Sequence, residues 1–249
     1  NFAHQTFRWS NEARGVAAVH VVIVGFSTVT VANPQLYEYQ NNQDVPIRRS
    51  AREINGYLME GEMIFILSRL QPRCSAPEMM SGNRPTDGGH LLLDPAEKLQ
   101  LLSECPAAYR YIKRCVGSLE FLNNKERYCL WMAGISPTDL RSMPPIMKRV
   151  EAVKAFRLAS AAETTRKLAV RPWEFRDTRH PSKSYIVYPS VSSENRQYIP
   201  AGFIGPETVT TNLNFMIPDG EIYHFGVLMS TMHMAWVRYV CGRLKSDYR

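Results

Sequence analysis

The sequence lacks the long hydrophobic run that a membrane-spanning helix requires. Its longest apolar stretch, from Val16 to Phe26, is interrupted by His20 and Gly25, and it falls short of the ~18 consecutive apolar residues expected of such a helix. No basic segment leads into an apolar one near the start, so the sequence predicts no signal peptide. These absences favour a cytoplasmic protein with no membrane partner. Because the chain starts at Asn1 and not at Met, we expect a piece of a longer protein.

Cysteine is scarce, and the motifs of several enzyme classes are missing. The five cysteines are odd in number and contain no C-x-x-C pair, which favours reduced thiols and gives no support for a zinc site. The chain has no G-x-S-x-G nucleophile motif, no P-loop and no G-x-G-x-x-G. Its six histidines are scattered and predict no metal cluster. These absences favour a binding protein over a complete enzyme.

The composition is that of a globular protein with a basic surplus. Of the 249 residues, 45% are hydrophobic and 21% are charged, which is enough apolar material to bury a core. Thirty Lys and Arg face 23 Asp and Glu, a net charge of +7. A surplus of this size is compatible with a nucleic-acid partner without requiring one.

The hydrophobic patterning predicts an α+β fold with mostly antiparallel strands. Strands are expected at 7–9, 16–24, 62–67, 184–188, 196–199, 209–217 and 222–225, and helices at 47–59, 95–116, 145–168 and 226–244. Asp94, Pro95 and Glu97 form a capping-box signature, and Pro106 is a possible break in the helix that follows. Ser136 repeats the N-cap signature. The longest helix is predicted to carry an apolar stripe of residues that step by three or four: Ile146, Val150, Val153, Arg157 and Ala161.

The basic surplus is concentrated in one stretch. Residues 141–183 hold eleven Lys and Arg against four Asp and Glu, a surplus equal to that of the whole chain. We expect part of this stretch to contact phosphates, because lysine and arginine displace the counterions of nucleic acids. The candidates are Lys148, Lys154, Arg157, Arg166, Lys167, Arg171, Arg179 and Lys183. The alternative is a solvated helix face with no partner.

A second candidate site follows close behind. If residues 193–198 are extended, Glu194, Arg196 and Tyr198 share one face, with neighbouring side chains of that face roughly 6.5 Å apart. A glutamate can accept a hydrogen bond from cytosine N4, and an arginine can donate two to guanine O6 and N7. The competing interpretation is a surface ion pair between Glu194 and Arg196, which contributes little. Composition alone favours neither interpretation over the other.

Several strings in the chain resemble one family, the adenine-N6 DNA methyltransferases of MmeI-type restriction–modification enzymes. FRWSNEA from Phe7 and AAVHVVIVGF from Ala17 resemble the end of their methyltransferase core. MSGN from Met80, with DGG from Asp87, is similar to the loop after that core. GSLEFLNN from Gly117, RYCLW from Arg127, YIP from Tyr198, STMHMAW from Ser230 and CGRLKSDYR from Cys241 resemble the target recognition domain.

The resemblance implies an organisation and a function. Residues 1–32 would be terminal strands of a class I methyltransferase sheet, residues 33–92 a connecting segment and loop, and residues 93–249 the DNA target recognition domain. Members of the family recognise a short DNA sequence, called the word below, with side chains in the stretch that resembles residues 193–198. The implied partners are double-stranded DNA and the remainder of the parent chain. Further upstream, Arg171, Trp173 and Arg179 are additional candidates for base reading.

The resemblance also implies what this stretch lacks. The family methylates adenine with S-adenosylmethionine and holds the flipped-out base with an Asn-Pro-Pro-aromatic motif. Asn33-Pro34-Gln35 is the nearest string and departs at its third position. We therefore expect no catalytic residues, metal or cofactor in this stretch, with S-adenosylmethionine bound by the full-length parent. Two alternatives remain: a fragment that still binds the cofactor and methylates, or a basic protein-interaction scaffold.

Overall fold

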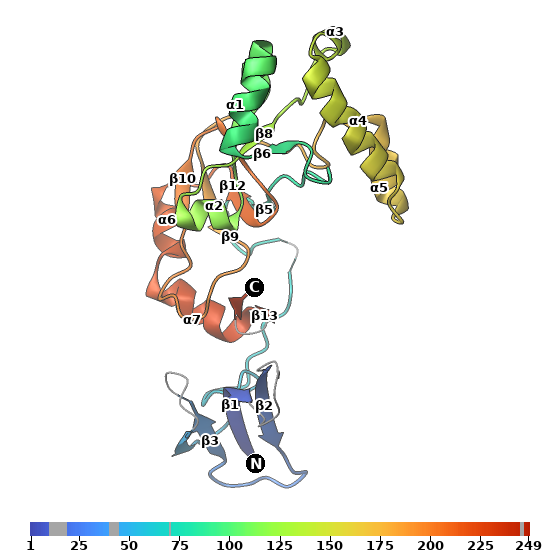
Figure 1. The fold of residues 1–249 in the computed structure, drawn as a ribbon. Coiled ribbons are helices and arrows are strands. Elements are labelled where there is room, and N and C mark those ends of the chain that lie inside the picture. Colours follow the sequence, from blue (N-terminus) through green and yellow to red (C-terminus); the bar gives the residue numbers. More distant parts are fainter. Residues whose placement is uncertain (10–18, 40–44, 70, 245–246) are drawn as a thin grey trace. The chain divides into compact units, whose positions relative to one another are not determined.

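The computed structural model describes residues 1–9, 19–39, 45–69, 71–244 and 247–249 (Figure 1). The chain forms two compact units. Unit 1 comprises Asn1–Ser75, Ser192–Gln197 and Met232–Arg249, and unit 2 comprises Ala76–Val191 and Tyr198–Thr231. Both contain strands with mostly antiparallel pairing, and the helices make the fold α+β, as the sequence predicts. The division after residues 32 and 92 stays a prediction, since compact units need not follow evolutionary domains.

A four-stranded sheet dominates unit 1. Its strands are β1 (Phe2–Trp9), β2 (Val19–Gly25), β3 (Gln35–Glu38) and β4 (Ile47–Ser50), in the order β2-β1-β3-β4. The antiparallel β1–β2 pair confirms the two strands expected at the start of the chain; residues 16–18 of the second lie outside the described residues. β1 also pairs with β3 in parallel.

Strand β2 is less covered than its sequence predicts. A run of valines without polar alternation is typical of a strand buried on both faces. Val22 and Val24 are nevertheless each 50% exposed. About half of each side chain therefore stays uncovered by the described residues, and further cover for this apolar strand stays a prediction.

Two expected elements of unit 1 are wrong. No helix forms over 47–59: Ile47 begins β4, which pairs with β3, and Asn55 Oδ1 accepts hydrogen bonds from the amides of Tyr57 and Met59 in a turn. Residues 62–67 are irregular and exposed, not a strand. In the first case strand pairing overrides a helix-like pattern. In the second, a short apolar run has no strand among the described residues to pair with.

Two further four-stranded sheets form the centre of unit 2. The first has the order β10-β9-β12-β5 and the second β11-β7-β8-β6. Their strands are β5 (Met80–Ser81), β6 (Leu92–Leu93), β7 (Ile112–Val116), β8 (Tyr128–Leu130), β9 (Tyr185–Pro189), β10 (Gly202–Ile204), β11 (Thr208–Thr210) and β12 (Asn214–Ile217). The expected strands at 184–188 and 209–217 are confirmed, the latter as two strands. All five residues of β9 are buried.

Helices and 3-10 turns surround these sheets. They are α1 (Pro95–Glu104), η1 (Pro106–Tyr111), α2 (Ser118–Asn123), α3 (Pro137–Arg141), α4 (Pro144–Leu158), α5 (Glu163–Lys167), η2 (Leu168–Val170) and α6 (Ile222–Leu228). Figure 1 shows α3, α4 and α5 following one another on one side of unit 2. α7 (Thr231–Val240) and the hairpin β13 (Arg243–Leu244) and β14 (Asp247–Tyr248) follow.

The local helix signals are confirmed. Asp94 Oδ1 accepts from the Glu97 amide, and Glu97 Oε2 accepts from the Asp94 amide, so both halves of the capping box exist. Ser136 Oγ caps α3 by accepting from the Asp139 amide. Ile146 and Val153 are fully buried in the main core cluster of unit 2, together with residues of α1, β7 and β8.

Other boundaries differ from expectation. The possible break at Pro106 is confirmed, because α1 ends at Glu104. Residues 112–116, expected in the same helix, instead form strand β7, which pairs with β8 and β11. α4 ends at Leu158, ten residues before the predicted end. Residues 222–225 are helical, not extended, with the Glu221 amide donating to His224 Nδ1. The closing helix expected at 226–244 is interrupted after Leu228, ends at Val240, and buries Met234 and Val237 in its last part.

Candidate functional site

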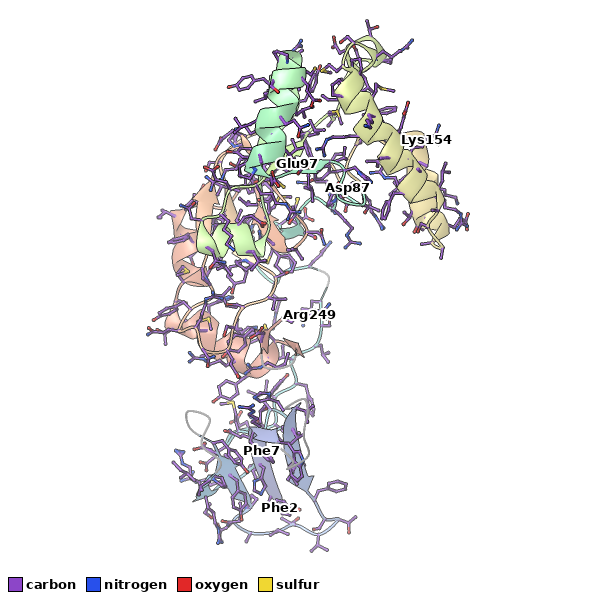
Figure 2. All side chains as sticks on the ribbon, viewed as in Figure 1. Phe2, Phe7, Asp87, Glu97, Lys154 and Arg249 are labelled. Atoms are coloured by element: carbon purple, nitrogen blue, oxygen red, sulfur yellow. The ribbon has the colours of Figure 1, made fainter. Side chains whose placement is uncertain are left out.

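Seven of the eight cations predicted to contact phosphates are exposed in unit 2. They are Lys148, Lys154, Arg166, Lys167, Arg171, Arg179 and Lys183. They lie on α4, where Figure 2 labels Lys154, on α5 and along the segment that leads to β9. Exposed ammonium and guanidinium groups remain hydrated and available to an anionic partner.

These cations differ in how far other groups already engage them. Lys167 Nζ lies 2.8 Å from Glu163 Oε1, and Arg171 Nη1 lies 3.0 Å from Glu174 Oε2. Arg166 donates to the carbonyls of Ser160 and Ala161. Within the described part of the chain, Lys148, Lys154, Arg179 and Lys183 have no ion pair or side-chain hydrogen bond. The latter four are therefore the strongest phosphate candidates.

The structure corrects the prediction for Arg157. This side chain is 1% exposed, and its guanidinium donates to five backbone carbonyls. The acceptors are Pro85, Thr86, Leu168, Arg171 and Glu174, at 2.6–3.1 Å. Burial lowers the pKa of Arg157, an effect that the nearby Asp87 carboxylate partly offsets. A guanidinium has five N–H donors, so none is left for a phosphate, and Arg157 instead joins α4 to two loops.

The predicted base-reading segment is a turn and not a strand. The Arg196 amide donates to Ser193 O at 3.1 Å, and the Asn195 amide donates to Ser193 Oγ at 3.3 Å. The strand expected at 196–199 is therefore wrong, as is the argument that Glu194 and Arg196 share a face by alternation. They instead belong to one tight turn in unit 1, with Asn195 between them. Their base-reading role stays a prediction.

The three side chains of this prediction have different surroundings. Glu194 lies within 4 Å of two basic side chains, His20 and Arg243. The Arg196 guanidinium has no hydrogen bond or ion pair among the described residues, and its side chain is partly exposed. Tyr198 belongs to unit 2, where its hydroxyl lies 3.3 Å from Thr231 Oγ1. Sequence reasoning missed His20 and Arg243, because no local pattern links residues so far apart.

Trp173, an upstream candidate for base reading, lies against protein. It packs on the main core cluster of unit 2. Arg171 and Arg179, the other upstream candidates, are exposed. The packing of Trp173 argues for a structural role.

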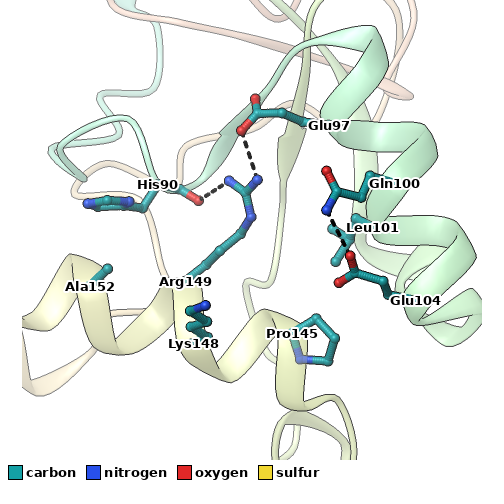
Figure 3. Close-up of a pocket in the computed structure, with 9 residues that line it drawn as sticks. All are labelled: His90, Glu97, Gln100, Leu101, Glu104, Pro145, Lys148, Arg149 and Ala152. Carbon is teal, nitrogen blue, oxygen red and sulfur yellow. Dashed lines mark hydrogen bonds and ion pairs between the residues drawn. The ribbon is translucent and has the colours of Figure 1, made fainter.

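One hollow of unit 2 lies between α1 and α4 (Figure 3). It has a volume of about 430 Å³. Arg149 Nη2 lies 2.8 Å from Glu97 Oε1, and its Nη1 donates to His90 O. The hydrogen bond from Arg149 is the main reason why the pKa of Glu97 is lowered. Because these charged groups pair with one another, the hollow has a structural explanation: the Arg149–Glu97 ion pair links α4 to α1. We call this ion pair the clip between α1 and α4.

The described residues contain neither a candidate metal cluster nor a membrane-spanning helix. They contain no group of three or more His, Cys, Asp or Glu that could hold a metal ion. No helix among them is both long and apolar enough to cross a bilayer.

All five cysteines are free. A hydrogen bond with Cys115, together with burial, raises the pKa of Cys129 well above its usual value.

Asn33-Pro34-Gln35, the segment most similar to the Asn-Pro-Pro-aromatic motif, also has a structural role. Pro34 O accepts a hydrogen bond from the Ala51 amide, and Gln35 begins β3. Asn33 adopts a positive φ of 56° just before this strand. The string therefore starts a strand in unit 1, in addition to lacking the second proline and the aromatic residue.

Comparison with known proteins places the chain in a family. The model of the MmeI target recognition domain matches residues 60–249, and that of the MmeI DNA-methyltransferase domain matches residues 1–38. "DNA methyltransferase A" of Bacillus subtilis (strain 168) is 43% identical over the whole chain, which spans 28% of that relative. A solved structure of the Type IIL restriction-modification enzyme MmeI in complex with DNA is also 43% identical, with a TM-score of 0.92, over the whole chain and 33% of that protein. The chain therefore belongs to the MmeI target recognition domain family and carries, at its start, a match to the methyltransferase domain.

Proposed function

We propose that this chain is the sequence-recognition part of an MmeI-type adenine-N6 DNA methyltransferase. The observation that carries the proposal is the match of residues 60–249 to the MmeI target recognition domain. The similar MmeI structure is a complex with DNA. The chain would read base edges in the major groove and direct methylation by the rest of the parent protein.

The charge distribution supports DNA as the partner. Lys148, Lys154, Arg179 and Lys183 are exposed and unpaired within the described residues. Such groups would bind phosphates irrespective of sequence and hold the protein on the duplex. Base reading would then fall to the turn that carries Glu194 and Arg196, with Tyr198 as a further candidate. A carboxylate close to DNA is repelled by phosphates, so a base amine is a reason for its presence there.

The chemistry of methyl transfer would belong to the part of the parent outside this chain. The sequence contains neither the Asn-Pro-Pro-aromatic string nor a glycine-rich cofactor loop. S-adenosylmethionine would therefore bind to the full-length parent, and this chain by itself would not methylate DNA.

A domain exchange tests the proposal. Residues 60–249 of the full-length methyltransferase would be replaced by the corresponding residues of a relative that methylates a different DNA word. Methylation sequencing of genomic DNA then shows which word the chimera modifies. We expect the word to follow the exchanged residues. A chimera that is active but keeps the word of the recipient would refute the proposal.

Calorimetry separates the proposal from its enzymatic alternative. The 249-residue chain is titrated with S-adenosylmethionine, with the full-length protein as the positive control. We expect binding to the full-length protein only. Saturable binding to the 249-residue chain would instead favour a fragment that retains the cofactor site.

A further inference from the structure

The Glu194 carboxylate lies between two basic side chains from distant parts of the sequence. Its Oε1 is 3.8 Å from His20 Nε2 on β2, and its Oε2 is 3.7 Å from Arg243 Nη1 on β13. The side chains of His20, Glu194 and Arg243 are 15%, 24% and 30% exposed. All three belong to unit 1. Each carboxylate oxygen therefore faces a different basic group in a partly buried setting.

The end of the chain also fixes the backbone beside Glu194. The Ser192 amide donates to Tyr248 O at 3.1 Å, and the Tyr248 amide donates to Ser192 O at 2.9 Å. These two bonds form an antiparallel bridge. The Arg243 guanidinium lies over the Tyr248 ring, 4.1 Å from its centre, a distance suited to a cation–π interaction. One short hairpin thus holds both the backbone and the carboxylate of this turn.

From this arrangement we propose that His20 and Arg243 are positioning residues, which aim the Glu194 carboxylate at the base it reads. The inference rests on the proposed function, because it assumes that Glu194 reads a base. It assigns a role in specificity to β2, in the stretch that matches the methyltransferase domain, and to the C-terminal hairpin. Neither segment contains a predicted base-reading residue.

Electrostatics gives the first reason for this role. DNA phosphates raise the energy of a nearby carboxylate, and a cation within 4 Å offsets that repulsion. Arg243 is always charged, so it supplies this offset at any physiological pH. Without it, Glu194 would turn toward other cations or away from the duplex.

Geometry gives the second reason. A carboxylate has about four lone-pair sites on its two oxygens, and His20 and Arg243 engage the oxygens from two directions. Acceptor capacity remains for the amine of a base. Contacts that discriminate between bases need side chains held in place by their neighbours. A glutamate free to change rotamer would accept from several partners and discriminate less.

The test is methylation sequencing with the full-length methyltransferase. We compare His20→Ala and Arg243→Ala with the unmodified protein, and score discrimination separately at each base pair of the recognised word. Each variant should lose discrimination about 10-fold at the one pair read by Glu194, a fraction of what a good base contact supplies. Discrimination at the other pairs should stay within twofold.

Two matched variants control for general damage. Arg8→Ala removes a cation from β1 at the residue paired with His20 across the strands, and Arg238→Ala removes one from α7. Neither side chain contacts Glu194 among the described residues. Both should keep the original discrimination. Arg243→Lys, which retains the charge, should restore part of the loss, and it also serves if Arg243→Ala does not fold.

A double-mutant cycle distinguishes failure of this inference from failure of the proposed function. In a Glu194→Ala background, Arg243→Ala should cause no further loss at the same pair, because the two act through one contact. If Glu194→Ala relaxes one pair while His20→Ala and Arg243→Ala leave it unchanged, the positioning role is refuted and base reading stands. If Glu194→Ala leaves the word unchanged, base reading itself is refuted.

Discussion

Arg157 Nε donates a hydrogen bond to Thr86 O over 2.9 Å, although 71 positions separate the two residues in the sequence. The same guanidinium donates to Pro85 O in the same loop and to three carbonyls between residues 168 and 174. It is the only member of the predicted phosphate-binding set that is buried in the described structure. A residue expected to contact DNA thus stabilises the scaffold that carries the cations around it.

Replacing Arg157 should therefore destabilise the fold. Arg157→Met keeps much of the volume but leaves five carbonyls without their donor, and we expect a loss of about 3–5 kcal/mol in the free energy of unfolding. Urea denaturation of the chain measures it. Lys154→Met, an exposed change on the same helix, should stay within about 0.5 kcal/mol. Equal midpoints for the two variants would contradict the structural role.

The exposed cations should show the opposite behaviour. Lys154→Ala and Lys183→Ala should each weaken binding to all DNA sequences alike, and each should reduce the slope of log affinity against log salt by about 0.9. Fluorescence anisotropy of the full-length protein at several salt concentrations measures the slope. Lys125→Ala, an exposed lysine outside the 141–183 stretch, is the control. Unchanged slopes for Lys154→Ala and Lys183→Ala would favour a solvated helix face.

The clip between α1 and α4 should contribute to acid sensitivity. The Arg149 hydrogen bond lowers the pKa of Glu97 in the folded chain, so its stabilisation is present above the unfolded pKa of about 4.3 and disappears as the pH falls through the folded pKa. Because the Glu97 side chain is 43% exposed, we expect only about 0.5 kcal/mol. In urea denaturation between pH 7 and pH 3, Arg149→Met should lose this part of the pH dependence. Parallel pH profiles for the two proteins would contradict it.

Gly82 should tolerate no side chain. A Cβ at this position would lie 2.2 Å from Thr211 O, where the backbone of one strand end passes another. We expect Gly82→Ala to cost about 1–3 kcal/mol. Gly226→Ala is the matched control, because its Cβ would meet nothing within 4 Å on helix α6, and it should stabilise by about 0.5–1 kcal/mol. Thermal unfolding compares the two, and a neutral Gly82→Ala would show that the backbones separate easily.

The sequence predicted those parts of the fold that depend on local chemistry. The Asp94 capping box and the Ser136 cap hold because their partners lie three residues away. The buried face of α4 holds because its period is that of the helix. Residues 112–116 were read as helical, and only pairing with β8 and β11, set by distant residues, makes them a strand.

In the candidate site, too, local features could be predicted from the sequence, and features set by distant residues could not. Charge clustering between residues 141 and 183 was visible in the sequence, since it requires no knowledge of the fold. The position of Arg157 on the buried face was visible too, because it continues the step of Ile146, Val150 and Val153. Its carbonyl acceptors were not, because loops distant in the sequence present them. His20 and Arg243 were missed for the same reason, since they meet Glu194 only after unit 1 has folded.

The most direct measurement exchanges the predicted base-reading pair. In the full-length methyltransferase, Glu194→Lys combined with Arg196→Asp reverses the order of acceptor and donor on the turn. Methylation sequencing should then show a word changed at one position, with discrimination against the original base altered by about 1–3 kcal/mol. An active double variant that still methylates the original word would contradict the account and leave Glu194 and Arg196 as surface residues.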